Sequence, residues 1–227
     1  MREELKIKEN VQLVGLGGLK GSGKDTLGQH LVDSINEKGE RFAIRIGLAD
    51  NLKRYCVDEY GMDMDICHAD NHTKNTTLSP VLWENMPTGI QHKYLNSRAD
   101  DIKLTYREAL QIIGTDLGRD EFGEDIWLER FTQAVNTITS DKPITVVITD
   151  VRFDNEAKFV MNNGGHVVRI MSDQKPNDHH VTEMGITHYN YEVEGKGRAS
   201  LAHSKGDIET LYGYMELHER VRNFIEE

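Results

Sequence analysis

The stretch GLKGSGKDT, residues 18–26, constrains this 227-residue chain more than any other part of it. Gly18, Gly23 and Lys24 fit the phosphate-binding pattern G-x-x-x-x-G-K-[ST], but Asp25 stands where a Ser or Thr is expected. The apolar run VQLVGLGG leads into the loop and predicts a strand. Apolar residues with helical spacing follow the loop at Leu27, Leu31, Val32 and Ile35. Because strand, loop and helix occur in this order, the pattern predicts a phosphate site and not a chance glycine turn.

The rest of the chain continues the alternation of strands and helices. Three more strands are expected, at RFAIRIGLAD (41–50), ITVVITD (144–150) and HVVRIM (166–171). Helices are expected over 51–62, along one face through Tyr106, Ala109, Leu110, Ile113 and Leu117, over 125–139, over 155–163, and from Ile208 to Val221. The alternation predicts an α/β fold with helices around a central, doubly wound parallel sheet.

Two long polar segments interrupt this regular pattern. Residues 62–101 are rich in turn-forming residues, which indicates either an inserted lobe or a mobile substrate-binding segment. Residues 172–205 form the second polar segment. A chain of this length suits a single α/β domain, with or without an inserted lobe.

Composition and charge narrow the class of protein. No apolar run approaches the roughly 18 residues that span a bilayer, and the start MREELKIKEN lacks the apolar stretch of a signal peptide, so we expect a cytoplasmic protein without a membrane partner. The formal net charge of −11 disfavours stable nucleic-acid binding. Cys56 and Cys67 form no CxxC pair, and we expect buried or incidental thiols and no disulfide.

Charged residues near the expected strand ends are candidates for the chemistry. Asp150 ends an apolar run at the edge where α/β sheets bind ligands, so it either orients Mg²⁺ or caps the next helix. Phosphoryl transfer also needs cations, because the moving group spreads negative charge over three oxygens. The candidate arginines are Arg107, Arg119, Arg152 and Arg169, although any one of them alone could be a solvated surface charge.

Aromatic and histidine residues are less informative. Trp127 is either a core ring or a platform on which a base stacks. Four histidines occur in the second polar segment and match no zinc pattern, so a solvated or substrate-facing loop is expected: His179, His180, His188 and His203.

Several motifs together resemble a known family. The stretches GLKGSGKDT, YREALQIIGTDLGRDEFGEDIW and ITDVRFDNEA, with the glycine pair Gly164 and Gly165, are similar to the deoxynucleoside monophosphate kinases of tailed bacteriophages. The likeness covers most of residues 11–171. It implies the three-layer fold of P-loop nucleoside monophosphate kinases and transfer of the γ-phosphoryl group of ATP to a deoxynucleoside monophosphate, with Mg²⁺.

The resemblance also implies roles for individual residues. ATP would be held by Gly21, Ser22, Gly23, Lys24, Asp25 and Thr26. The monophosphate side would be formed by Lys20, Arg107, Gln111, Arg119 and Trp127. Lys24 and Arg119 would also act at the catalytic centre, with the D-x-R-x-x-x-E residues Asp150, Arg152 and Glu156. Segment 62–101 would contribute to a monophosphate-binding lobe, segment 172–205 would be a lid, and a homodimer is compatible with the family.

Two other readings remain open. Phosphomevalonate kinases also resemble the chain at an S-G-K-D loop, so another small-molecule P-loop kinase is the nearest alternative. A nucleotide-dependent switch or DNA-packaging motor is the alternative from a different class. A GTPase switch would normally carry N-K-x-D, and this tetrad does not occur in the sequence.

Asp25 is the least expected residue in the loop. Adenylate-kinase-like enzymes, which the G-S-G-K-x-T spacing resembles, place a threonine one position later, so Thr26 would supply the hydroxyl for Mg²⁺. Asp25 could then act on Mg²⁺, on Lys24 or on an arginine. The simplest alternative is an acid in the first turn of a helix, where the helix dipole favours it.

Overall fold

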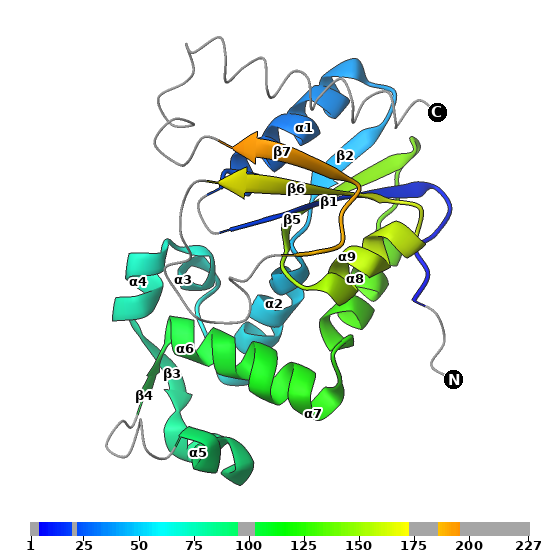
Figure 1. The fold of residues 1–227 in the computed structure, drawn as a ribbon. Coiled ribbons are helices and arrows are strands. Elements are labelled where there is room, and N and C mark those ends of the chain that lie inside the picture. The colour runs from blue at the N-terminus through cyan, green and yellow to red at the C-terminus, as the bar shows by residue number, and fades with distance from the viewer. Residues whose placement is uncertain (1–4, 20–21, 95–102, 173–185, 196–227) are drawn as a thin grey trace. The chain divides into compact units, whose positions relative to one another are not determined.

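The computed structural model describes residues 5–19, 22–94, 103–172 and 186–195. The chain forms two compact units, whose elements are labelled in Figure 1. The sheet unit consists of residues 1–47 and 132–227, and the helical unit consists of Leu48–Phe131. Helix α8 (Ile126–Thr137) begins in the helical unit and ends in the sheet unit.

The sheet unit is built on five parallel strands. They are β1 (Val11–Gly18), β2 (Phe42–Arg45), β5 (Ile144–Val151), β6 (His166–Ser172) and β7 (Tyr191–Gly195). Their order across the sheet is β2-β5-β1-β6-β7, and every neighbouring pair is parallel. β1 and β5 are buried along nearly their whole length, as strands covered on both faces must be. The predicted central parallel sheet is therefore confirmed.

Helices cover both faces of this sheet (Figure 1). α1 (Lys24–Lys38) buries Leu27, Leu31 and Val32 against apolar side chains of the strands. Burial of each such side chain contributes roughly 1.5–3 kcal/mol, which fixes the helix to the sheet. α9 (Asp154–Asn162) covers the opposite face, where a Cβ built on Gly15 would lie 3.5 Å from Val160. The result is a three-layer α/β/α arrangement.

The ends of α1 are set by glycines and one asparagine. Gly23 precedes the helix with φ 94° and Gly39 follows it with φ 75°, a left-handed conformation that suits glycine. The Gly39 N–H donates to the Asn36 carbonyl. The Asn36 side chain donates to the Ala43 carbonyl at 2.9 Å and accepts from the Ala43 N–H at 2.8 Å, so it links α1 directly to β2.

The helical unit is a group of short helices around a two-stranded antiparallel sheet. The strands are β3 (Leu78–Leu82) and β4 (Lys103–Thr105). The helices before β4 are α2 (Leu48–Tyr60), α3 (Met64–His68), α4 (Asn71–Thr76), the 3₁₀ turn Trp83–Asn85 and α5 (Thr88–Tyr94). After β4 come α6 (Tyr106–Gln111), a π-helix (Ile112–Arg119), α7 (Asp120–Phe122) and the start of α8.

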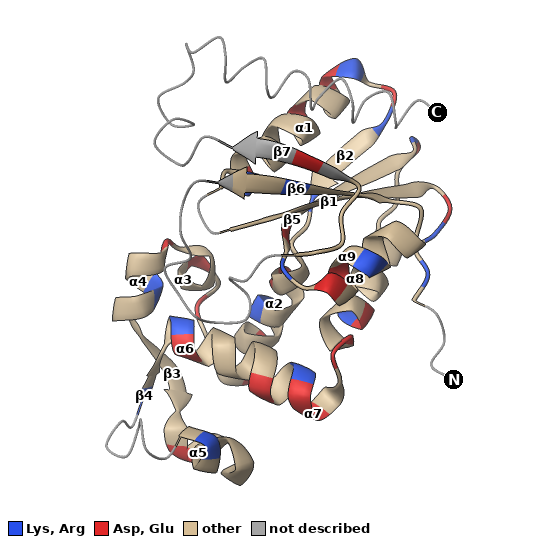
Figure 2. Ribbon diagram, in the orientation of Figure 1, with Lys and Arg blue, Asp and Glu red and all other residues tan. Residues whose placement is uncertain are grey.

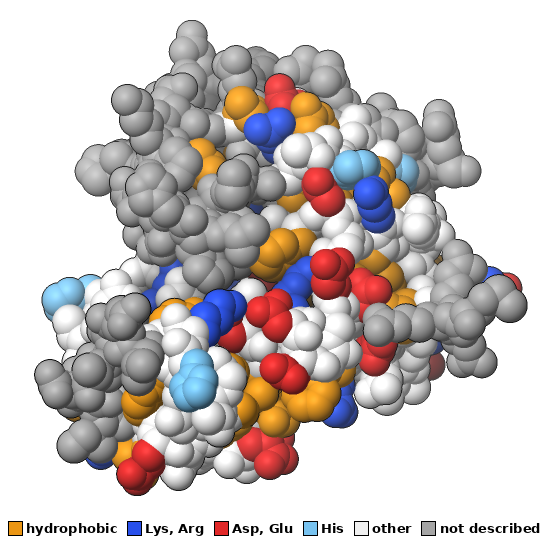
Figure 3. Space-filling model, turned by 60° about the horizontal axis from the view of Figure 1, so that its bottom comes forward, with side chains coloured by type: hydrophobic (Ala, Val, Ile, Leu, Met, Phe, Trp, Pro, Cys, Tyr) orange, Lys and Arg blue, Asp and Glu red, His pale blue; other side chains and the backbone are white. Residues whose placement is uncertain are grey.

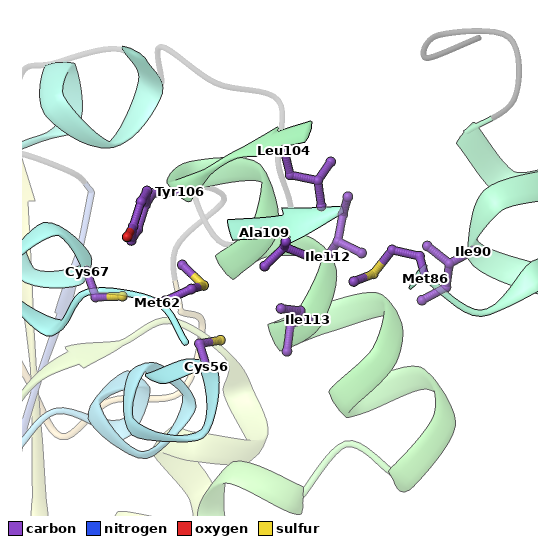
Figure 4. Packing of buried hydrophobic residues seen from close by; sticks show 11 residues of the cluster. Cys56, Met62, Cys67, Met86, Ile90, Leu104, Tyr106, Ala109, Ile112 and Ile113 are labelled. Carbon is purple, nitrogen blue, oxygen red and sulfur yellow. The ribbon is translucent and has the colours of Figure 1, made fainter. Parts of the chain in front are cut away.

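This unit has its own apolar core, shown in Figure 4. Its members come from α2, α3, both strands, α5, α6 and the π-helix, and Met62 and Met86 from the connections between elements complete it. Leu104, Ala109, Cys56 and Cys67 have no exposed surface. The sequence prediction of buried thiols is confirmed, because both cysteines are free and buried in this core.

Burial makes these thiols unreactive. Burial, together with the nearby Cys67, raises the pKa of Cys56 to about 12, and burial also raises the pKa of Cys67. Since only the thiolate reacts, we expect the native protein at neutral pH to show no fast reaction with a thiol reagent such as DTNB. Denatured protein should release two equivalents of the chromophore, one from Cys56 and one from Cys67. Fast labelling of the native protein would contradict the burial of this core.

Several elements differ from the sequence predictions. The strand expected over 41–50 ends at Arg45, because Leu48 is already buried as the first residue of α2. Segment 62–101 contains α3, α4, β3 and α5, which are too short to give a clear apolar period. Strand β7 was not expected, since it lies within the second polar segment and pairs along one edge only. The helix expected from Ile208 to Val221 lies outside the described residues.

Charge is spread over the described surface. Acidic and basic residues occur side by side on helices of both units (Figure 2), and the face in Figure 3 carries both signs interspersed with apolar side chains. No helix in the described parts of the chain is both long and apolar enough to cross a membrane.

Candidate functional site

The loop predicted to bind phosphate joins β1 to α1 at the carboxyl edge of the sheet. Gly18 has φ 142°, and a Cβ built there would lie 2.4 Å from the Ile170 carbonyl oxygen, so this position requires glycine. Lys24 Nζ donates to the carbonyls of Gly18 at 2.8 Å and Leu19 at 2.6 Å. The ammonium group thus lies against the loop that precedes its own helix. Two predicted loop residues, Lys20 and Gly21, lie outside the described residues.

The N-terminus of α1 is held close to β5. A Cβ built on Gly28 would lie 2.2 Å from the Thr149 methyl group, so only glycine allows this approach. Lys24, Asp25 and Thr26 form the first turn, where backbone N–H groups are left without helical partners. A helix N-terminus with a lysine beside it favours anions such as phosphate.

Asp25 contacts two residues that the sequence did not single out. Its Oδ1 accepts a hydrogen bond from Thr149 Oγ1 at 2.9 Å and lies 3.5 Å from Arg45 Nη1. Thr149 is buried in β5, whereas Arg45 is the last residue of β2. Of the alternatives open for Asp25, the structure therefore shows a contact with an arginine.

A bulge distorts β5 beside the loop. Gly15 pairs with Ile148 and Gly17 with Val151, so the two residues Thr149 and Asp150 lie opposite the single residue Leu16 of β1. Bulges bend a strand and redirect side chains, and they are common next to active sites. Asp150 is half-buried at this irregular end of β5. Its place at the carboxyl edge agrees with the sequence expectation.

Glu156 organises the turn between β5 and α9. Its Oε2 accepts from the backbone N–H groups of Arg152 at 2.7 Å and Phe153 at 3.0 Å. Phe153 is the residue before α9 and has no side-chain acceptor of its own, so the glutamate forms only that half of a capping box that reaches back from the third residue of the helix. The buried Glu156 carboxylate thereby fixes the backbone that carries the Arg152 side chain.

Asp154 ties α9 to the segment that precedes β7. Its Oδ1 accepts from the Thr187 N–H at 2.7 Å, and its Oδ2 accepts from Thr187 Oγ1 at 2.6 Å. The His188 N–H donates to the same carboxylate at 3.2 Å, and His188 Nδ1 lies 3.3 Å from Oδ1. Burial alone would raise the pKa of Asp154, but the donors on Thr187 and His188 lower it to about 2.

This lowered pKa predicts a stability change at acid pH. The carboxylate is stabilised in the folded state, so its contribution is complete above its ordinary pKa of 3.8 and is lost as the pH falls toward 2. We expect Asp154→Asn to reduce the free energy of unfolding by about 1 kcal/mol at neutral pH and to flatten its decline between those values. Urea unfolding at several pH values measures this change, with Asp33→Asn on α1 as the control. An unchanged pH profile in Asp154→Asn would contradict the assignment.

The other predicted residues lie in the helical unit. Arg107 and Gln111 are on α6, Arg119 ends the π-helix, and Trp127 is on α8. All four are half-buried. A π-helix is rare and often marks a functional site.

The Trp127 side chain packs against the π-helix. Its Nε1 donates to the Gly114 carbonyl at 2.7 Å, and a Cβ built on Gly118 would lie 2.6 Å from its ring. Gly118 thus makes room for the indole, while Gly114 accepts its hydrogen bond and leaves space for Leu52, which a Cβ on Gly114 would approach to 2.6 Å. The ring of Tyr55 lies 6.2 Å from that of Trp127, so aromatic side chains gather here.

Asp116 is a buried acid in the same π-helix. It accepts a hydrogen bond from Tyr94 Oη at 2.8 Å and one from Lys93 Nζ. The Asp116 carboxylate is the main cause that raises the pKa of Lys93. These bonds attach α5 to the π-helix.

The predicted residues thus fall into two groups. The sheet unit holds Ser22, Gly23, Lys24, Asp25, Thr26, Asp150, Arg152 and Glu156. The helical unit holds Arg107, Gln111, Arg119 and Trp127. Sequence reasoning missed Arg45, Thr149 and Asp116, which lie outside any motif that it used. Arg169, one of the four candidate arginines, lies over the Tyr189 ring at 5.3 Å and 3.6 Å from Glu192, which indicates a structural role in the sheet.

The first turn of α1 offers oxygen ligands that suit Mg²⁺. The Asp25 carboxylate and the Thr26 hydroxyl are both exposed on it, and Mg²⁺ prefers such hard oxygen donors. Within the described residues, no three His, Cys, Asp or Glu side chains are grouped to hold a metal ion. Sites that bind Mg²⁺ together with phosphate use only one or two protein ligands, so the residues present fit such an ion. His179, His180 and His203 lie outside the described residues, and His188 faces Asp154.

A glycine loop between the central strand of a parallel sheet and the helix that follows it is typical of α/β proteins that bind phosphate groups at the carboxyl edge of the sheet. The profile of the family described as Deoxynucleotide monophosphate kinase matches residues 67–193, more than half of the chain. The protein belongs to this family and is a phosphotransferase.

Curated relatives agree with this family. A putative deoxynucleotide monophosphate kinase of Acanthamoeba polyphaga mimivirus is 29% identical over 168 residues, covering 70% of this chain and 72% of the relative. The deoxynucleoside-5'-monophosphate kinase of Escherichia phage T5 is 27% identical over 189 residues, covering 65% and 71%. A gluconokinase from Sinorhizobium meliloti 1021 aligns over 93% of this chain and 95% of its own, with 13% identity and a TM-score of 0.31, which is too low to establish a common fold.

Proposed function

We propose that this protein transfers the γ-phosphoryl group of ATP to a deoxynucleoside 5'-monophosphate and so supplies diphosphates for viral DNA synthesis. The observation that carries the proposal is the Lys24 ammonium group, which lies in a glycine loop at a helix N-terminus in a chain of this family. We place the reaction in the host cytoplasm. A homodimer is part of the proposal and would be measured by light scattering.

On this proposal the sheet unit binds ATP. The loop N–H groups and Lys24 neutralise the β- and γ-phosphates, as they do in other phosphate-binding loops. Thr26 would hold Mg²⁺, with Asp25 or Asp150 as a further ligand directly or through water. Bound in this way, Mg²⁺ supplies positive charge to the phosphate oxygens. Arg152, on a backbone fixed by Glu156, would stabilise the charge that develops on the transferred group.

The helical unit would bind the monophosphate. Arg107 and Arg119 are suited to its phosphate, since guanidinium groups bind phosphate through two hydrogen bonds. Gln111 would donate to or accept from the nucleotide, and Trp127 would contact the base. In this proposal Lys20 also binds the monophosphate and Gly21 binds ATP. Residues 62–101 contribute to the monophosphate-binding lobe, and residues 172–205 form the lid.

The chemistry needs no strong general base. The second pKa of a phosphate monoester is near 6, so the acceptor is largely ionised and nucleophilic at neutral pH. The tasks left to the protein are alignment of the two phosphates, neutralisation of their charge and exclusion of water. Cations and backbone N–H groups perform the first two.

A substrate panel tests the proposal. Purified protein with ATP and Mg²⁺ is incubated with dTMP, dGMP, dCMP, dAMP or phosphomevalonate, and the products are separated by chromatography. We expect ADP and a deoxynucleoside diphosphate in equal amounts. A product from phosphomevalonate alone would favour the other small-molecule kinase. Rapid ATP hydrolysis stimulated by DNA, with no diphosphate product, would indicate a motor.

A further inference from the structure

Arg45 lies at the edge of the sheet where the phosphate-binding loop is found. It is the last residue of β2 and pairs with Val147 of β5, two residues before Thr149. Val147 and Thr149 both face α1, because a Cβ built on Gly28 of that helix would approach both side chains. Arg45 is paired with Val147, so it projects on the same face, toward the first turn of α1.

Asp25 connects this arginine to the loop. It directly follows Lys24, and its Oδ1 lies between Arg45 Nη1 at 3.5 Å and Thr149 Oγ1 at 2.9 Å. Thr149 is buried and packed closely against Gly28, so its hydroxyl holds the carboxylate from the protein side. The carboxylate is thereby fixed in a position from which it orients the guanidinium group.

The Asp25–Arg45 pair adds little to the stability of the fold. The side chains of Arg45 and Asp25 are 41% and 80% exposed, and exposed ion pairs contribute only about 0–1 kcal/mol. A guanidinium group has five N–H donors, and one carboxylate oxygen at this distance engages few of them. The pair therefore places a cation with unused hydrogen-bonding capacity next to the first turn of α1, the helix that begins at the loop lysine.

We propose that Arg45 binds a phosphate group of a bound nucleotide and that Asp25 is the positioning residue that aims it there. This inference rests on the proposed function and adds to it a cation from β2, outside the motifs shared with the family. It gives Asp25 a role other than that of a ligand to Mg²⁺. The phosphate belongs either to ATP or to the monophosphate, and the experiment below separates the two.

An arginine just before the same strand provides a matched control. Arg41 immediately precedes β2, at the opposite edge of the sheet, where its Nε donates to Thr145 Oγ1 at 2.9 Å and its Nη2 to the Ile144 carbonyl at 3.0 Å. Arg41→Gln removes the same charge as Arg45→Gln does, from the residue just before the strand that Arg45 ends. A general effect of charge or of strand stability would appear in both variants, whereas loss of phosphate binding would appear only in Arg45→Gln.

The first test compares steady-state kinetics, with each substrate varied in turn. We expect Arg45→Gln to lower kcat/KM about tenfold or more for ATP or for the monophosphate, and Arg45→Lys to restore part of it. A larger rise in KM for one substrate identifies the source of the phosphate. Isothermal titration with MgADP and with the monophosphate should show the matching loss of affinity. Values for Arg45→Gln within twofold of those for Arg41→Gln would overturn the proposal.

A double-mutant cycle tests the positioning role of Asp25. If Asp25 acts through Arg45, Asp25→Asn should lower kcat/KM in the wild-type background and have little further effect in Arg45→Gln. If Asp25 acts on Mg²⁺ instead, its effect should persist in Arg45→Gln and diminish at high Mg²⁺ concentration, and the positioning role would be wrong. Wild-type protein that phosphorylates no deoxynucleoside monophosphate would refute the proposed function, a result distinct from an active wild type with an inert Arg45 substitution.

Discussion

Lys24→Met should reduce phosphoryl transfer by about a thousandfold or more and leave the fold intact. The ammonium group donates to the Gly18 and Leu19 carbonyls, and Lys24 is only half-buried. Methionine keeps most of the length of the side chain but removes its charge and its donors. The charge that builds up on the β- and γ-phosphates would then be neutralised less well in the transition state.

Lys38→Met on the same helix is the control for this substitution. Lys38 is in the last turn of α1, where a cation interacts favourably with the helix dipole. This variant should lose a few tenths of a kcal/mol of stability and keep its turnover. Circular dichroism and thermal unfolding would confirm that both variants are folded. Turnover of Lys24→Met near that of the wild type would refute the assignment of the loop.

Arg152→Ala should lower kcat by about a hundredfold or more while changing the KM for ATP by no more than about threefold. The side chain follows β5 by one residue, and Glu156 fixes its backbone through the Arg152 and Phe153 N–H groups. A cation held in this way at the carboxyl edge of the sheet is suited to stabilise the transferred group, whose charge is greatest in the transition state. An effect confined to the KM for ATP would contradict this role.

Arg169→Ala is the control for Arg152→Ala. Arg169 lies over the Tyr189 ring and beside Glu192, so its loss should lower the melting temperature and spare kcat. Glu156→Gln offers a second test. Its amide oxygen still accepts from the two N–H groups, but more weakly, so we expect a smaller loss of kcat than in Arg152→Ala.

The sequence predicted the sheet unit well, because the apolar runs and glycines in that part of the sequence match the burial and close packing found there. The apolar runs that become β1 and β5 are buried on both faces, and Gly18 and Gly28 occupy positions where a Cβ would collide with the sheet. Strand β7 was not predicted because it is short, lies in a polar segment and is separated from its partner β6 by residues 173–190. The spacing of apolar residues along the sequence contains no information about which strands pair.

The helical unit was harder to predict. Its helices α3 and α4 have five and six residues and depend on Asp63 and Asp70, whose side chains cap them. The apolar spacing from Tyr106 to Leu117 predicted one continuous helix, and the chain does turn helically there, but as a π-helix from Ile112 onward. Residues at four-residue intervals are also near one another in a π-helix, so the pattern cannot separate the two forms.

At the candidate site, the sequence indicated several of the residues but not the residues that contact them. Lys24, Asp150 and Arg152 follow motifs, and each lies at the carboxyl edge of the sheet as expected. The contacts of Asp25 with Arg45 and Thr149 span 20 and 124 positions of the chain and arise only when β2, β5 and α1 come together. A salt bridge between distant residues leaves no local signal.

The π-helix restricts the insertions and deletions that this part of the chain can accept. A π-helix is an α-helix with one extra residue in a turn, so loss of one residue within Ile112–Arg119 would restore regular α-helical bonding. Because the wider π turn absorbs the extra residue, the helix after it would keep roughly its present direction relative to α6. Within the stretch itself, a deletion between Gly114 and Gly118 would change their four-residue spacing and disrupt the contacts of both with Trp127. The contacts of Trp127 therefore fix the number of residues between the two glycines.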